Sequence, residues 1–115
     1  MKYYKQDEIK EHAITEIKEH LNYDKDYLNN DFADVHHDLF NTDYYIIGYY
    51  NAEKWLGSNV FECIRTIQDY ENDNFGEVTT DLSDSEKVVN MYAYIIGEDI
   101  LQGVINEFKE VKTTK

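Results

Sequence analysis

Apolar side chains recur every three or four residues along most of this chain, and no proline interrupts the pattern. That spacing places them on one side of an α-helix, which then buries that side against other helices. Proline breaks helices from within, so its absence favours long helices. At 115 residues, the chain has the size of one domain and can bury a proper core. We therefore expect an all-α fold, a compact bundle of about five helices in a single domain over 1–115.

The segments expected to be helical span residues 6–21, 27–40, 44–56, 59–70 and 84–108. Residues 44–50 would also suit a buried strand because they are aromatic and β-branched, but the helix-favouring 51–56 follows without a break. We expect 44–56 and 84–108 to be the central pair of helices. Ser83 and Glu86 have the spacing of a capping box, with Ser83 as the N-cap. A polar loop is expected over 71–81, with Phe75 beneath it.

A four-residue motif that occurs twice in the sequence indicates close packing. Tyr-Ile-Ile-Gly occurs at 45–48 and again at 94–97. A glycine inside a helix costs about 1 kcal/mol relative to alanine, so each position needs a reason. We expect the two central helices to cross closely at Gly48 and Gly97.

The strongest compositional signal is the acidic charge. The net charge is −13, and the stretch from Asp26 to Glu86 holds fourteen acids against two bases, Lys54 and Arg65, which gives −12. Nucleic-acid binding depends on basic residues that displace counterions from phosphates, so we expect no direct contact with nucleic acid. The field of this region should instead attract basic protein surfaces, mainly within ~8 Å at physiological salt.

The location expected from the sequence is the cytoplasm. Cys63 is the only cysteine, which rules out an internal disulfide and fits a reducing compartment. No apolar run approaches the ~20 residues of a membrane span. The first five residues lead directly into a charged helix and do not resemble a signal peptide.

Two groups of residues have the spacing of metal ligands. His12, Glu16 and His20 stand at i, i+4 and i+8 and could ligate zinc or another transition metal from one helix face. Asp34 and His37, at i and i+3, are the second group. The alternative for the first group is an ordinary solvated helix face. The alternative for the second is that His36 lies at the core edge while His37 lies in water beside acids. A structural metal site usually needs four ligands, so we expect no metal and no cofactor.

The sequence shows no catalytic constellation. Cys63 falls on the apolar side of its helix, where a buried and unreactive thiol is expected. His36 is expected at the edge of the core, with His37 in water beside acids. The chain has no Gly-x-Ser-x-Gly elbow, no glycine-rich phosphate loop and no Cys-x-x-Cys pair. We therefore expect a protein that is not an enzyme.

Helical spacing predicts that several of the acids lie in rows along the surface of their helices. Asp31, Asp34 and Asp38 rise by ~4.5 and ~6 Å along a helix, on a scale comparable with the ~3.4 Å between phosphates of one DNA strand. Tyrosines among acids make better contact surfaces than acids alone. The candidate partner-binding residues are Asp31, Asp34, Asp38, Asp43, Glu53, Glu62, Asp69, Glu71, Asp73, Tyr49, Tyr50 and Tyr70, and Glu77 and Asp81 extend the array.

The stretches 36–45 through 55–57, and 80–98, resemble small proteins encoded by phages and mobile elements of Gram-positive bacteria. The resemblance implies a phage setting and no activity that transfers residue by residue. In that setting, short acidic proteins often imitate DNA and occupy restriction or CRISPR nucleases. By this analogy the expected function is a DNA-mimic inhibitor of a DNA-binding host or defence enzyme, acting in the bacterial cytoplasm. The alternative is a helical interaction or assembly protein, such as a homodimer, whose acidic surface serves solubility only.

Overall fold

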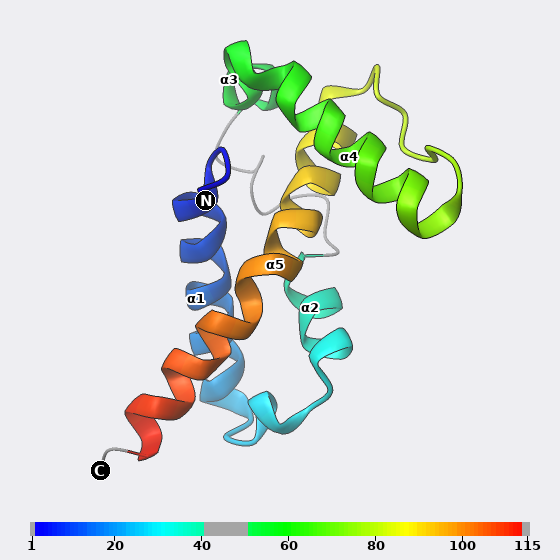
Figure 1. Cartoon of the computed structure of the whole chain (residues 1–115). Coiled ribbons are helices and arrows are strands. Elements are labelled where there is room, and N and C mark those ends of the chain that lie inside the picture. Colours follow the sequence, from blue (N-terminus) through cyan, green and yellow to red (C-terminus); the bar gives the residue numbers. More distant parts are fainter. Residues whose placement is uncertain (1, 41–50, 114–115) are drawn as a thin grey trace.

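The computed structural model describes residues 2–40 and 51–113, and every regular element within them is helical (Figure 1). The all-α prediction is confirmed. The described residues form four helices of nine or more residues and one short helix. These are α1 (Gln6–Tyr23), α2 (Phe32–Phe40), the short α3 (Ala52–Leu56), α4 (Val60–Phe75) and α5 (Ser85–Thr113).

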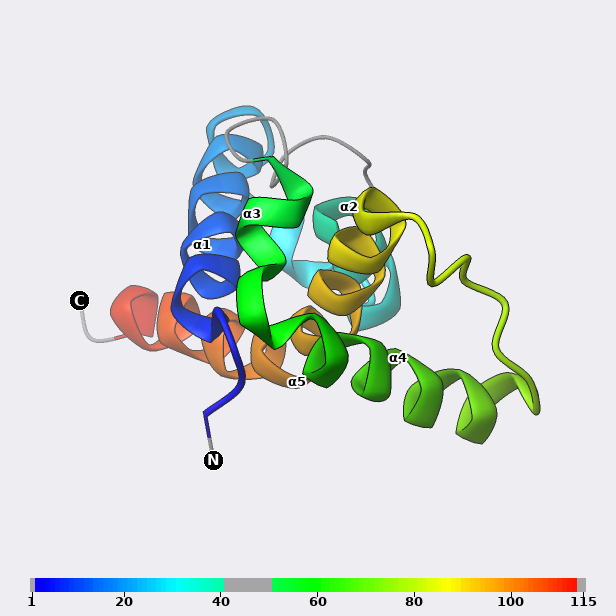
Figure 2. The same ribbon diagram turned by 90° about the horizontal axis from the view of Figure 1, so that it is seen from above.

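Helix α5 is the central helix of the fold, because each of the other four helices packs against it. Its 29 residues span about 43 Å at ~1.5 Å per residue. Figure 1 shows α3 and α4 near its beginning and α1 beside its second half, and Figure 2 shows α4 projecting sideways from the other helices. The buried residues of α5 are Val88, Val89, Tyr92, Ala93, Ile95, Ile96, Leu101, Val104 and Ile105.

The predicted apolar side of α1 is confirmed, since Ile9, Ala13 and Ile17 are fully buried. The second predicted helix is shorter than expected. Residues 27–29 form a 3₁₀ turn, and Asn30 has extended backbone with ψ 161°. This extended residue separates the turn from α2, which therefore begins only at Phe32.

The expectation of one unbroken helix over 44–56 is wrong at Asn51. This residue has extended backbone, with φ −68° and ψ 130°, and its Oδ1 accepts hydrogen bonds from the amides of Glu53 and Lys54. Asn51 is therefore an N-cap, where a new helix starts. The first part of the predicted segment, 41–50, lies outside the described residues.

Helix α4 extends five residues beyond its predicted end at Tyr70. It ends where Gly76 adopts φ 78°, a left-handed conformation that a residue without Cβ reaches at little cost. The Gly76 amide donates to the Asn72 carbonyl at 3.1 Å. The expected loop from residue 71 therefore starts only after Phe75, and Phe75 is 57% exposed and not tucked beneath the loop.

The predicted capping box at the start of α5 is wrong by one residue. Asp84 is the side-chain cap, because its Oδ1 accepts from the amides of Glu86 at 3.1 Å and Lys87 at 3.4 Å. Ser83 instead donates its hydroxyl to Asp81 Oδ1 at 2.6 Å. An aspartate at an N-cap also places negative charge at the positive end of the helix dipole.

Gly97 does allow a close approach, but its neighbour comes from α2. A Cβ added at Gly97 would stand 2.6 Å from a ring carbon of Phe40. Both residues are buried. The predicted crossing partner, Gly48, lies outside the described residues.

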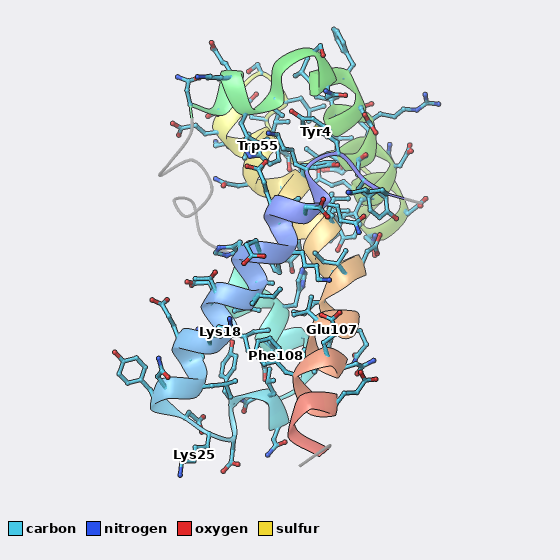
Figure 3. The ribbon with its side chains drawn as sticks, turned by 90° about the vertical axis from the view of Figure 1, so that its left-hand side faces the viewer. Tyr4, Lys18, Lys25, Trp55, Glu107 and Phe108 are labelled. Carbon is cyan, nitrogen blue, oxygen red and sulfur yellow. The ribbon has the colours of Figure 1, made fainter. Side chains whose placement is uncertain are left out.

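Three aromatic rings tie the N-terminal segment to α3 and α5. The ring centroids of Tyr4, Trp55 and Tyr92 stand 5.7 to 6.4 Å apart. The Tyr92 hydroxyl donates to the Tyr4 carbonyl at 2.7 Å, and the Tyr4 hydroxyl donates to the Trp55 carbonyl. Figure 3 shows Tyr4 and Trp55 together at this end of the molecule. The cluster fixes α3 against α5, directly before α4 begins.

Candidate functional site

The acids of α2 are exposed, as expected. Asp31, which directly precedes α2, and Asp34 and Asp38 within it all face solvent, and the spacing of Asp34 and Asp38 places these two on one flank of the helix. Asp38 Oδ2 accepts a hydrogen bond from the buried Tyr27 hydroxyl at 3.3 Å. Burial, followed by the Asp38 charge, raises the pKa of Tyr27, so this hydroxyl keeps its proton.

Helix α4 presents both acids and aromatic rings to solvent. Glu62, Asp69 and Asp73 are exposed along one flank, as their spacing predicts. Phe61 is 79% exposed and Phe75 is 57% exposed. These two rings are about 21 Å apart along the helix axis, at ~1.5 Å per residue. Exposed aromatic side chains beside charged ones are typical of residues that anchor protein–protein contacts.

Two predicted binding residues of α4 are withdrawn from solvent, Glu71 fully and Tyr70 partly. Glu71 is 1% exposed, and its carboxylate accepts four hydrogen bonds, from the amide and hydroxyl of Thr79 and of Thr80, at 2.8 to 3.1 Å. Burial alone would raise the pKa of Glu71, but these hydrogen bonds outweigh it and lower the pKa. Tyr70 is half-buried and donates to Glu98 at 3.3 Å. Three other candidates, Asp43, Tyr49 and Tyr50, lie outside the described residues.

Glu53 stands beside acids from the start of α5. A hollow of about 560 Å³ between α3 and α5 is lined by Glu53, Asp81, Asp84 and Glu86. The Ser83 hydroxyl and amide donate to Asp81, which lowers the pKa of Asp81. Asp84 and Glu86 lie at a helix start, where negative charge is favoured. These two acids were outside the predicted set, and the turn before α5 brings them next to Glu53.

Three lysines at the N-terminal end pair with acids outside the acidic middle region. The ion pairs are Lys2 with Asp7 at 2.7 Å, Lys5 with Glu8 at 3.0 Å and Lys10 with Glu107 at 3.6 Å. None of these three pairs within the described chain involves an acid of residues 26–86.

The two histidines of the first metal candidate, His12 and His20, make other contacts. His12 Nε2 donates to the Leu39 carbonyl at 2.8 Å, and burial lowers the pKa of His12 although this hydrogen bond opposes the effect. The His20 ring stacks on Tyr27 with centroids 4.2 Å apart. Across the ranges that the structure describes, no three His, Cys, Asp or Glu side chains are placed to hold a metal ion.

The second candidate consists of two exposed side chains, Asp34 and His37. The neighbouring His36 is 3% exposed and lies deeper than the core edge where the sequence placed it. Its Nε2 donates to the Tyr94 carbonyl at 2.8 Å, since a carbonyl can only accept. His36 therefore joins α2 to α5.

Cys63 is a fully buried core thiol. Burial, followed by the charge of Glu62, raises the pKa of Cys63 to about 12, so almost none of it is thiolate at neutral pH. We expect no reaction of the native protein with 5,5′-dithiobis(2-nitrobenzoate) at mildly alkaline pH, and full reaction after unfolding in guanidinium chloride. Rapid labelling of the folded protein would contradict this burial.

Comparisons with protein-family models, with curated protein sequences and with solved structures find no match to this chain. Within the described residues, no helix is both long and apolar enough to cross a membrane.

The two exposed phenylalanines of α4 are absent from the residues that the sequence predicts for binding. The sequence pattern places Phe75 beneath a loop and assigns no role to Phe61. A signal was present for Phe61, because a helix that buries Cys63 and Ile67 turns residue 61 away from the core. For Phe75, the signal depended on recognising that the helix continues to Gly76.

Proposed function

We propose that this protein is a non-enzymatic binding protein whose docking surface is the solvent-facing half of α4. The observation that supports this most is the presence of Phe61 and Phe75 near the two ends of that half, beside Glu62, Asp69 and Asp73. We call these five residues the α4 face. Its acids favour a partner with a basic surface, and its rings offer apolar anchors.

The partner that fits this surface best is a DNA-binding enzyme. Basic surfaces that also tolerate apolar contacts occur in the DNA-binding clefts of nucleases and other DNA-binding enzymes. In the phage setting that the resemblance implies, occupying such a cleft would make this chain a DNA-mimic inhibitor. The charge of −12 between Asp26 and Glu86 supports this form, because a negative surface repels DNA and attracts the basic residues that bind phosphates in such a cleft.

The test measures inhibition and affinity with purified bacterial DNA-cleaving enzymes as probes. The expected result is loss of DNA cleavage and an affinity that falls as salt rises. The double variant Glu62→Gln with Asp69→Asn should bind about tenfold more weakly, and Phe61→Ala should have an effect of about the same size. The matched control is Glu11→Gln with Glu19→Gln, which removes two exposed charges from α1 and should leave affinity unchanged.

Three outcomes would contradict the proposal. The first is an absence of binding to every enzyme in the panel, and the second is an affinity that salt does not change. The third is an equal loss in the α1 and α4 variants, which would point to net charge and not to the α4 face. A stable oligomer in sizing chromatography that Phe61→Asp dissociates would favour the assembly protein instead.

A further inference from the structure

A second hollow lies at the far end of α4, beside Phe75. Its volume is about 490 Å³, and it opens between the end of α2, the last turn of α4, the following loop and the first turns of α5. Its apolar lining comes from Phe40, Phe75, Met91 and Tyr94. This volume is within the ~300–1,000 Å³ of typical ligand pockets, and aromatic linings are common in them.

The walls of this hollow are held in place by contacts already described. Phe40 is 1% exposed and packs against Gly97, which fixes one wall. Thr79 and Thr80, which also line the hollow, are held by their four hydrogen bonds to the Glu71 carboxylate. A site that exists before binding loses little freedom when it is filled.

Phe75 is the exposed residue of the apolar lining. Its ring meets Tyr70 edge-on, with centroids 6.3 Å apart and planes at 84°, and 57% of the residue still faces solvent. A flat ring entering the hollow would cover Phe75 and meet Met91 and Tyr94 on the other side. Aromatic pairs gain interaction energy beyond that of burying their area, so a ring is favoured over an aliphatic group.

Charged side chains around the hollow determine which charge is favoured in a group that binds there. Asp81 lines the hollow, and Glu77 is exposed in the loop that follows Phe75. Lys87 also lines the hollow, but it lies close enough to Asp81 to lower the pKa of that acid. The acids therefore exceed the lysine, and positive charge beside an incoming ring is favoured.

We propose that this hollow receives an aromatic side chain of the partner protein, flanked in the partner by lysine or arginine. This inference rests on the proposed function, because it names the anchor that a basic partner would insert beside the α4 face. The bound ring would contact Phe75 and Met91, and its basic neighbours would meet Glu77 and Asp81.

The experiment uses the full chain and three capped peptides, Lys-Trp-Lys, Glu-Trp-Glu and Lys-Ala-Lys. The chain has two methionines, Met1 and Met91, so selective ¹³C-methyl labelling gives a single reporter inside the hollow. Lys-Trp-Lys should shift the Met91 methyl signal through the ring current of the indole, with millimolar affinity. Glu-Trp-Glu should bind at least fivefold more weakly, and Lys-Ala-Lys should leave the signal in place.

Two variants distinguish binding in this hollow from binding elsewhere on α4. Phe75→Ala removes one wall and should weaken the Lys-Trp-Lys response at least fivefold, whereas Phe61→Ala removes a similarly exposed ring at the other end and should not. Both side chains are largely exposed, and the near-ultraviolet spectrum of the buried Trp55 checks that each variant is folded. An unmoved Met91 signal with Lys-Trp-Lys would overturn the inference, and so would equal responses to Lys-Trp-Lys and Glu-Trp-Glu.

The two proposals can fail separately. If Met91 responds as expected but no DNA-cleaving enzyme binds, the hollow recognises a basic aromatic segment and the proposed function is wrong. If enzymes bind through the α4 face while the Met91 methyl signal does not move, the α4 face is the docking surface, and the inference of an aromatic anchor in the hollow is wrong.

Discussion

Replacing Glu71 with alanine should lower the free energy of unfolding by about 3 kcal/mol, because it removes a buried acceptor of four hydrogen bonds. In the loop between α4 and α5, the amides of Thr79 and Thr80 donate hydrogen bonds to this carboxylate. Without it, the loop must open to water or leave donors unpaired. Urea denaturation followed by circular dichroism measures the loss, and Asp73→Asn, an exposed change on the same helix, should stay within about 0.5 kcal/mol.

The contribution of Glu71 should also depend on pH in a fixed direction. Its pKa is lowered in the folded protein, so its stabilising effect is complete above the ordinary glutamate pKa and is lost as pH falls through the lowered one. The difference in free energy of unfolding between the wild type and Glu71→Gln should therefore be largest near pH 7. It should shrink once the pH drops below about 4.3, the ordinary glutamate value. A difference that grows on acidification would show that the carboxylate is not stabilised by its hydrogen bonds.

The second large effect is expected for Gly97→Ala, which should destabilise the protein by about 2 kcal/mol. The added methyl would stand 2.6 to 2.7 Å from three ring carbons of Phe40. That ring cannot retreat easily, because it is 1% exposed and lies beside His12 and His36. Overpacking of this kind costs roughly 1–3 kcal/mol or more, which exceeds the gain of about 1 kcal/mol from replacing a helical glycine.

Gly103→Ala is the matched control in the same helix. Gly103 is exposed, and a Cβ there would meet nothing within 4 Å. The substitution should therefore stabilise the protein by up to about 1 kcal/mol through helix propensity alone. Opposite signs for the two glycines in one denaturation series are the expected result. Stabilisation by both would mean that Phe40 can move away from α5 at little cost.

The sequence by itself determined the helical class and the apolar sides of the helices. Ile9, Ala13 and Ile17 recur with the helical period and are buried, and so are Val35 and Leu39. A hydrophobic period depends only on residues a few positions apart, so it can be read without knowing the fold. Exposure of Glu62, Asp69 and Asp73 follows from the same local geometry, since the opposite side of α4 was identifiable as core.

The tertiary structure decided what happens where distant segments meet. Glu71 looks like one more acid of a solvated helix until the loop folds back and offers it four donors from Thr79 and Thr80. Gly97 signals a close contact, but only packing selects Phe40 of α2 as the neighbour. The hollow beside Phe75 exists because four separate elements converge there. Periodicity encodes which side of a helix is apolar, whereas the partner of each side chain depends on the relative placement of whole elements, which no local pattern contains.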